Sequence, residues 1–391
     1  MKTHLMDLPF RWGKIQQAMQ AAQISVCILQ SATNLFYTQG RVVSGYAFIF
    51  ATGEPLFFQR RPVLESNQHH TIGIRKIEDV PALLAARGLH LSGKVAVELD
   101  TLSVNEFTRL QAALSLTDTC NANHLLRQVR AIKTDYEIEQ MRRSATLHTE
   151  LYARIPAMYK PGMTDYDLEV EVAYEARKQG SLGYFRVFGQ SMEIHAGSVI
   201  GGDNALEASP YDFALGGAGM HPSLPVGANA ASLSSGQTVM VDIGGNYTGY
   251  MSDLSRVYSI GVLPTEQAQR AHNLSIAIHE ALTHLAKPGV KASELYEHAM
   301  LLVEQADMQD YFMGYTQHAA FIGHGVGIEI NEMPVLSARS RDVLAKGMII
   351  ALEPKFVIPD VGAVGIEDTY LVSEDGLVCL TEMPREICVL S

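Results

Sequence analysis

Apolar and polar residues follow two different periods in the first part of the chain. Residues 10–23 (FRWGKIQQAMQAAQ) space their apolar side chains along one face of a helix, which predicts an amphipathic helix. Short apolar runs separated by turn residues predict strands at 24–30, 46–52, 55–58 and 94–100. Strands that alternate with helices indicate a small α/β domain of about 120 residues.

Helical spacing dominates after residue 135. Residues 135–159 (DYEIEQMRRSATLHTELYARIPAMY) predict one long helix, ended by Pro161 and Gly162. The side chain of Thr164 can cap a second helix, which we expect to run to about Gly180.

Several features recur in the same order in the second part of the chain. In each copy a long helical pattern precedes a Lys-Pro-Gly turn, a second helix follows it, and a glycine opens an apolar strand that ends six residues later in a carboxylate. The matching positions are 160–162 and 287–289, 184–185 and 311–312, and 236–242 and 347–353. We predict a duplicated unit whose halves are related by an approximate two-fold axis.

Each half of this repeat also predicts a β-hairpin that carries two acidic residues. In QTVMVDIGGNYTGYMSDLSRVYSI, a turn centred between Tyr247 and Thr248 places Asp242 opposite Asp253. In the second half, a turn centred on Asp360 places Glu353 opposite Glu367. Directly opposed side chains lie about 4.5–5.5 Å apart at Cβ.

Four converging carboxylates are unfavourable in a protein core. Like charges across a sheet repel each other, and burial of an unpaired charge costs several kcal/mol. Two divalent cations about 3.5–4 Å apart, bridged by carboxylates, resolve the conflict and form a catalytic arrangement. His324, between two glycines in FIGHGVGIEI, is the candidate nitrogen ligand.

Length, composition and charge narrow the class of protein. The 391 residues, 47% of them apolar, predict two globular domains, which we place at 1–125 and 126–391. The net charge of −12 argues against nucleic acid as a partner. The first residues show no signal-peptide core, no apolar run is long enough for a membrane span, and the four cysteines show no CxxC pairing. We therefore expect a cytoplasmic protein with no membrane association.

The segments VDIGGNYTGYMSDLSR, GHGVGIEINEMP, ALEP and GIEDTYLVSEDG resemble the metallopeptidases of family M24, which include methionine aminopeptidase, prolidase and Xaa-Pro aminopeptidase. The segments RQVRAIKTDYEIEQMRRSA and KPGMTDYDLE resemble the opening of the same catalytic domain, and the preceding residues resemble the creatinase/prolidase N-terminal domain. The resemblance implies an α+β fold: a pita-bread catalytic domain after a smaller α/β domain.

The resemblance also implies roles for the acidic residues and the histidine. Asp242 chelates one metal ion, Asp253 and Glu367 bridge two ions, and His324 and Glu353 bind the second ion. A water between the ions is the nucleophile, and Glu353 helps to move its proton. The implied ions are manganese, cobalt, zinc or iron, because mixed oxygen and nitrogen ligands suit several of them. The implied partners are a small peptide or small-molecule substrate and a second subunit in a homodimer.

Three positions depart from the family pattern. Val226 stands where the family has His in a segment like LPHG, after a one-residue gap, and Asn331 stands where it has His in VHE. Gly365 replaces the Arg of RIED. Valine cannot donate a hydrogen bond, and asparagine can donate one but cannot carry a proton at neutral pH. We consider Asn331, His221 and His318 as candidate substrate-binding residues; His195 is a further histidine that could take over a missing role.

These departures leave alternatives open. The first hypothesis is a hydrolase of small peptides or amide-like substrates, similar to Xaa-Pro aminopeptidases and dipeptidases. The second is a metal-dependent lyase or hydrolase that acts on a small non-peptide metabolite. The third is a non-catalytic binding protein on the same scaffold, which the intact ligand set disfavours.

Overall fold

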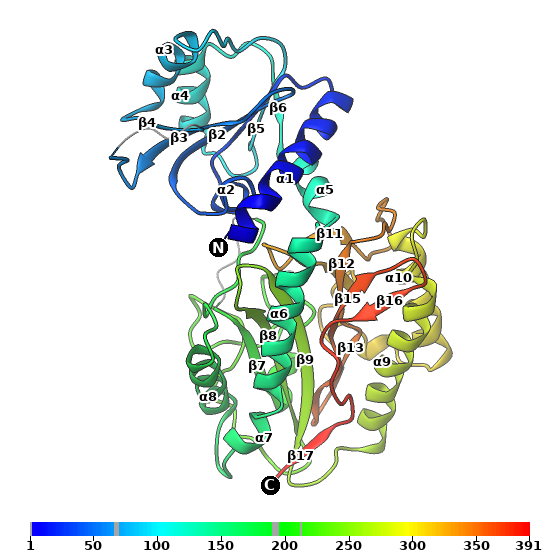
Figure 1. Ribbon diagram of the computed structural model, residues 1–391. Helices are drawn as coiled ribbons and strands as arrows, with labels where there is room; N and C mark the ends of the chain where they lie inside the picture. Colours follow the sequence, from blue (N-terminus) through cyan, green and yellow to red (C-terminus); the bar gives the residue numbers. More distant parts are fainter. Residues whose placement is uncertain (1, 66–69, 190–194, 212) are drawn as a thin grey trace. The chain divides into compact units, whose positions relative to one another are not determined.

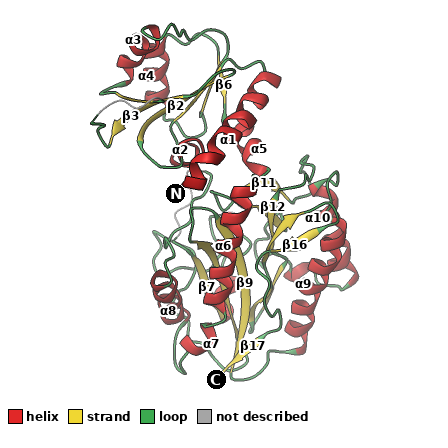
Figure 2. Ribbon diagram, in the orientation of Figure 1, coloured by secondary structure: helices red, strands yellow, loops and turns green. Residues whose placement is uncertain are grey.

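The computed structural model of the protein describes residues 2–65, 70–189, 195–211 and 213–391. The chain divides into two compact units, Met1–Arg130 and Ala131–Ser391. Both units combine helices with β-sheet (Figures 1 and 2).

The first unit is built on a mixed six-stranded sheet with the strand order β4-β3-β2-β1-β5-β6. Strand β1 pairs antiparallel with β2 and parallel with β5, and the four predicted strands are all present. Apolar side chains of these strands form a core with those of α3 and α4. The strands are β1 (Val26–Leu29), β2 (Ser44–Phe50), β3 (Leu56–Arg61), β4 (Thr71–Gly73), β5 (Val95–Val97) and β6 (Thr119–Asn121). The helices are α1 (Lys2–Ala21), α2 (Ala32–Gln39), η1 (Ile77–Asp79), α3 (Val80–Ala85), α4 (Val104–Leu114) and α5 (Asn123–Ala131).

The second unit repeats the order of two helices followed by antiparallel strands. Its first half has α6 (Asp135–Tyr152), α7 (Ile155–Met158), α8 (Asp165–Lys178), β7 (Gly197–Gly201), η2 (Gly202–Leu206), β8 (Thr238–Asn246) and β9 (Met251–Ile260). Its second half begins with α9 (Glu266–Leu285), α10 (Ala292–Gln305) and η3 (Gln309–Tyr311). The strands that follow are β10 (Gly323–Gly325), β11 (Glu332–Val335), β12 (Ile349–Leu352), β13 (Lys355–Ile358), β14 (Gly362–Gly365), β15 (Asp368–Val372), β16 (Leu377–Cys379) and β17 (Cys388–Leu390).

The long helix predicted at 135–159 is interrupted, so this prediction was wrong in its length. Helix α6 ends at Tyr152, and the short α7 begins at Ile155 with Pro156 in its first turn. Proline inside a helix lacks the donor for the carbonyl four residues earlier and clashes with it, and that carbonyl belongs to Tyr152. The second prediction was correct: Thr164 caps α8, and its hydroxyl accepts a hydrogen bond from the amide of Asp167.

The long helix of each half packs beside the acidic residues: α6 packs on β9, which carries Asp253, and α9 packs on β14, which ends two residues before Glu367. Figure 1 shows α6 lying along β9. The hydroxyl of Tyr152 on α6 donates to the carbonyl of Val241 at 3.1 Å. His279 on α9 contacts the carbonyl of Ile366 through Nε2 at 3.1 Å. Tyr152 and His279 are separated by the same 127 positions as the two Lys-Pro-Gly turns. Each helix thus fixes the backbone one residue before a predicted metal ligand.

Candidate metal centre

The first hairpin, β8–β9, does not have the predicted register. Asp242 pairs with Ser255, and Asp253 pairs with Gly244, so the predicted pairing of the two aspartates was wrong by two residues. The turn lies one residue later because Gly249 takes a left-handed φ of 84° and its amide donates to the side chain of Asn246. A shift of two residues keeps every side chain on its face of the sheet. Asp242 and Asp253 therefore share one face as diagonal neighbours.

The second acidic pair has the predicted register. Leu352 pairs with Asp368, and Lys355 pairs with Gly365, which leaves Glu353 and Glu367 opposite each other between these two pairs. Both glutamates are buried, with 5% and 1% of their surface exposed. The turn around Asp360, which has a positive φ of 64°, closes the β13–β14 ribbon symmetrically.

One backbone bridge brings the two acidic pairs together. Ser255 on β9 and Glu367 form an isolated antiparallel bridge in which each amide donates to the other residue's carbonyl. The Ser255 hydroxyl also donates to Oε2 of Glu367 at 2.7 Å. Thr369 extends the contact, because its hydroxyl accepts from the amide of Asp253 and donates to the carbonyl of Asp253. The acidic residues of both halves consequently converge on one site.

His324 faces this site from β10. The strand lies between β11 and β12, and a Cβ on Gly323 would stand 2.2 Å from the carbonyl oxygen of Ala351. Glycine is thus required there for close strand packing. Nδ1 of His324 contacts the carbonyl of Gly325 at 3.1 Å, which orients the ring and directs Nε2 to the site. Nε2 lies 3.2 Å from Oε1 of Glu353 and 3.9 Å from Oδ2 of Asp253.

The site also contains a cation that the sequence reasoning missed, Lys355. Its Nζ lies 2.8 Å from Asp242 Oδ2, 2.9 Å from Glu353 Oε2 and 2.9 Å from Glu367 Oε2. The side chain is fully buried. An ammonium group has three donors, and these three contacts engage all of them. A lysine two residues after Glu353, at the start of an otherwise apolar strand, was the signal available in the sequence.

The electrostatics of the site show a deficit of positive charge. Burial, reinforced by the charges of Asp242 and Glu353, raises the pKa of Asp253 to about 7 against the effect of His324. Burial and the charge of Asp253 also raise the pKa of Glu367 well above its usual range, despite Lys355.

Two groups of opposite sign hold their charges at this site. Burial would raise the pKa of Glu353, but Lys355 and His324 overcome it and lower the value to about 2. Burial would lower the pKa of His324, but the hydrogen bond and charge of Glu353, with Asp253, raise it to about 9. The pKa of Lys355 lies well above its ordinary value, because Asp242, Glu353 and Glu367 outweigh burial.

One position in the site fits a divalent cation. One ligand atom each from Asp253, His324 and Glu367 lie within 4.8 Å of one another. Ligands bound at about 2.0–2.2 Å stand at most about 4.4 Å apart, so small side-chain movements suffice to close this triad on an ion. Among the described residues, Oε1 of Glu367 is buried and has no hydrogen-bond partner. An oxygen of this kind fits a metal ligand.

The three positions that depart from the family pattern differ in their surroundings. Asn331 clamps the backbone of Phe188: its Oδ1 accepts from the amide at 2.7 Å, and its Nδ2 donates to the carbonyl at 3.0 Å. Val226 is buried. A side chain on Gly365 would stand 2.7 Å from the carbonyl oxygen of Pro354 and 3.0 Å from Cα of Lys355, so the backbone leaves no space for arginine.

The candidate histidines outside the triad have other surroundings. His221 is exposed and contacts Ser223, and His318 is exposed with Nδ1 2.7 Å from the carbonyl of Phe312. Over the described residues, no hydrogen bond or ion pair joins either one to the carboxylates. Their predicted contact with substrate therefore gains no support from these contacts.

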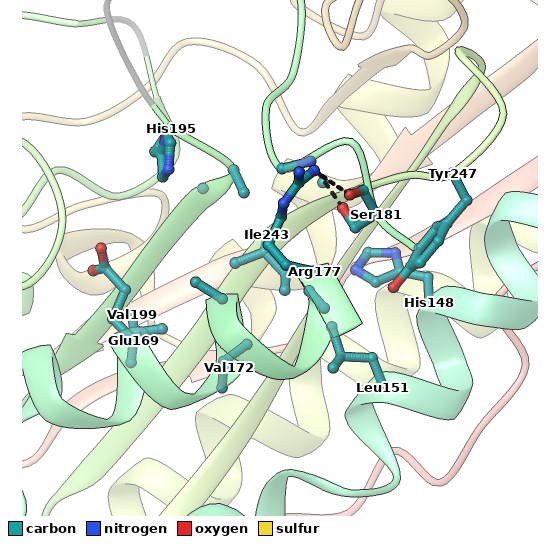
Figure 3. Close-up of a pocket in the computed structure, with 16 residues that line it drawn as sticks. His148, Leu151, Glu169, Val172, Arg177, Ser181, His195, Val199, Ile243 and Tyr247 are labelled. Carbon is teal, nitrogen blue, oxygen red and sulfur yellow. Dashed lines mark hydrogen bonds between the residues drawn. The ribbon is translucent and has the colours of Figure 1, made fainter. Parts of the chain in front are cut away.

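His195 lines a separate, mainly apolar pocket between α6, α8 and the β7–β8 strands (Figure 3). Ile243, Val172 and Leu151 supply apolar walls, and Arg177 donates to the carbonyl of Ser181. Ile243 neighbours Asp242 in an alternating strand, so its side chain points away from the acidic face. None of the five predicted metal ligands is among the lining residues described.

The triad fits a metal ion, and comparisons with known proteins identify the class of this protein. Residues 139–374 match the sequence profile of metallopeptidase family M24, and residues 11–132 match the creatinase/prolidase N-terminal domain. The chain belongs to metallopeptidase family M24 and is a metallohydrolase.

Relatives match nearly the whole chain. The Xaa-Pro dipeptidase of Pyrococcus furiosus is 24% identical over 382 residues, covering 96% of this chain and 99% of that protein. The solved structure of an Xaa-Pro dipeptidase from Bacillus anthracis superposes with a TM-score of 0.80 at 24% identity, over 98% of this chain and 100% of that one. An X-Pro aminopeptidase from Thermotoga maritima gives 0.77 at 19% identity, over 95% and 99%. The predicted pita-bread fold with its smaller α/β domain is confirmed.

Within the described residues, no helix is long and apolar enough to cross a membrane.

Proposed function

We propose that this protein is a metal-dependent dipeptidase that hydrolyses small peptides at an Xaa-Pro bond. The main support is that Asp253, His324 and Glu367 converge into a triad that fits a divalent cation, in a chain that belongs to family M24. The relatives named Xaa-Pro dipeptidase, which match over nearly the full length, support the choice of substrate.

The residues of the site would have different roles in hydrolysis. A bound divalent cation supplies Lewis acidity, which polarises a substrate carbonyl and acidifies water. Asp253, His324 and Glu367 would hold it. Glu353 is held through Oε2 by Lys355, so its Oε1, which faces His324, is the atom placed to accept a proton and pass it to the leaving amine.

An apolar wall beside the triad suits the ring of proline. A Cβ on Gly244 would lie 3.0 Å from Cδ1 of Phe185 and 3.4 Å from Cδ1 of Ile330. Gly244 is directly opposite Asp253, and opposed residues project on the same face of a sheet. The ring of Phe185 and the side chain of Ile330 therefore border the acidic face and can hold an apolar substrate group.

The cation and the assembly are further parts of the proposal. Two carboxylates and one imidazole accept manganese, cobalt, zinc or iron, and the two-ion set predicted from the sequence includes Asp242 and Glu353 as well. By analogy with the family, we also propose a homodimer that acts in the cytoplasm. Light scattering after size exclusion would measure the mass of the particle.

The test is hydrolysis of Xaa-Pro dipeptides and tripeptides after addition of manganese or cobalt to chelator-treated protein. The matched control is Glu353→Gln, which keeps the shape of the side chain and removes the proton acceptor. We expect metal-dependent release of the N-terminal residue that the control lacks. Equal rates in the two proteins, or no hydrolysis with either metal, would contradict the proposal.

A second candidate function has its own observation. Val226 is apolar and buried, and the Asn331 amide is engaged by the backbone of Phe188, so neither position supplies the proton carrier that the family pattern has there. Loss of one donor to a developing oxyanion costs about 2.7–4 kcal/mol. A metal-dependent lyase or hydrolase of a small non-peptide metabolite is the alternative that these two positions favour. Turnover of organic acids or sulfonium compounds, with peptides inert, would favour it.

A further inference from the structure

A buried ammonium group occupies the space beside Asp242 where the sequence pattern predicts one of two metal ions. Nζ of Lys355 lies within 2.9 Å of one oxygen each from Asp242, Glu353 and Glu367. A first-row cation bound at about 2.0–2.2 Å to the oxygens of Asp242 and Glu367, two of the predicted ligands of that ion, would need the volume that Nζ fills. The ammonium and that ion exclude each other.

We propose that Lys355 permanently replaces one of the two cations, so that this chain binds a single divalent ion through Asp253, His324 and Glu367. The inference deepens the proposed function, since both require an ion at the triad. It differs in predicting one ion for each chain, and in assigning Asp242 to the lysine instead of to a metal.

Three features keep Lys355 in place. Its side chain is fully buried, so the ammonium cannot turn into water without a rearrangement of its surroundings. Removing a buried charge from its partners is strongly unfavourable. The ribbon also leaves space for the lysine side chain, because its directly opposed neighbour on β14 is Gly365. Lys355 and position 365 project on the same face of the ribbon because they are directly opposed. The lysine therefore supplies a positive charge on the face where the family pattern has an arginine at position 365.

The balance of charge supports one ion. Four carboxylates surround the site: Asp242, Asp253, Glu353 and Glu367. With Lys355 and one divalent ion, three positive charges face four negative ones. With two divalent ions, five positive charges would face the same four. The lysine therefore makes a second ion electrostatically unfavourable, and we expect its affinity to be weaker than that of the first by roughly 100-fold or more.

The experiment counts ions on the intact protein. Chelator-treated protein is titrated with Mn²⁺ by calorimetry, and the metal retained after gel filtration is measured by elemental analysis. We expect one ion per chain in the wild-type protein and in Lys346→Ala, which removes an exposed lysine paired with Glu374. We expect two ions in Lys355→Ala, because the oxygens that Nζ engages become free.

Several results would overturn the inference. They are two ions in the wild-type protein, no ion in the wild-type protein, or one ion in a folded Lys355→Ala variant. If that variant does not fold, the electron paramagnetic resonance spectrum of the Mn²⁺-loaded wild-type protein decides. An isolated Mn²⁺ signal supports the inference, and a spin-coupled pair, expected for ions about 3.5–4 Å apart, contradicts it.

This count is independent of catalysis. One ion per chain without Xaa-Pro hydrolysis would leave the inference intact and contradict the proposed function. Xaa-Pro hydrolysis by a protein that binds two ions per chain would contradict the inference and leave the proposed function intact.

Discussion

The two halves of the repeat in the second unit hold similar ribbons but contribute unequal charges. The β8–β9 hairpin supplies Asp242 and Asp253 as diagonal neighbours, and 22% of the Asp242 side chain remains exposed. The second half supplies two opposed, buried glutamates and also both basic groups described at the site, His324 and Lys355. The backbone is duplicated, but the charges of the site are not. The negative charges of Asp242 and Asp253 in the first half are balanced by basic groups from the second half.

The largest expected effect comes from the second half. His324→Ala should lower the affinity for Mn²⁺ by at least about 100-fold, because even partners behind a ligand contribute about 10–100-fold. Competition with a fluorescent chelator measures this. Asp253→Asn should have a comparable effect, although it belongs to the first half, because it shares the triad. Unchanged affinity in both variants would show that the ion binds elsewhere.

The next effect separates the two aspartates of the first half. Asp242→Asn removes one charged partner of Lys355, which should lower the free energy of unfolding by about 1.5–3 kcal/mol. Its affinity for Mn²⁺ should change by less than about tenfold, because Asp242 does not belong to the triad. Chemical denaturation of the metal-free protein and the same chelator competition give the two values. A loss of affinity as large as that of Asp253→Asn would make Asp242 a metal ligand.

A third effect depends on pH and on His279, whose ring contacts the carbonyl of Ile366 beside the second hairpin. Burial lowers the pKa of His279 in the second half from 6.5 to about 3. Between these values the unfolded chain binds a proton that the folded chain excludes, so the free energy of unfolding falls as the pH drops from about 6.5 towards 3. This histidine contributes a slope of up to about 1.4 kcal/mol per pH unit.

His279→Gln should therefore reduce that slope in metal-free protein. Ser275→Ala is the matched control. Its hydroxyl, on the same helix, accepts a hydrogen bond from the amide of Ile366, so the substitution removes a similar contact without removing a titrating group. Denaturant melts at several pH values measure both. Equal slopes in His279→Gln and wild type would contradict the assignment.

The smallest effect compares the helix starts after the two Lys-Pro-Gly turns. Thr164 and Lys291 stand 127 positions apart, but only Thr164 makes a capping hydrogen bond from its side chain. Thr164→Ala should cost about 1 kcal/mol, and Lys291→Thr should add about 0.5–1 kcal/mol. Thermal unfolding of the two variants tests the comparison. Destabilisation by Lys291→Thr would show that the two helix starts are not equivalent.

Local patterns predicted the strands, the capped helix and the register of the second acidic pair, because alternation and turn symmetry act within a few residues. The register of the first hairpin was wrong because the Asn246–Gly249 contact moves the turn. Pro156 ended α6 at Tyr152, a consequence that its position could have revealed. Lys355 was missed because its role depends on three carboxylates from different strands. The Ser255–Glu367 bridge joins segments more than 100 positions apart and has no local signal.

An anomalous difference map from crystals of the wild-type protein grown with Mn²⁺ would locate the bound ions. We expect one peak, bound by Asp253, His324 and Glu367, with Nζ of Lys355 still beside Asp242. Two peaks with the lysine displaced, or no peak at the triad, would disprove the single-ion site.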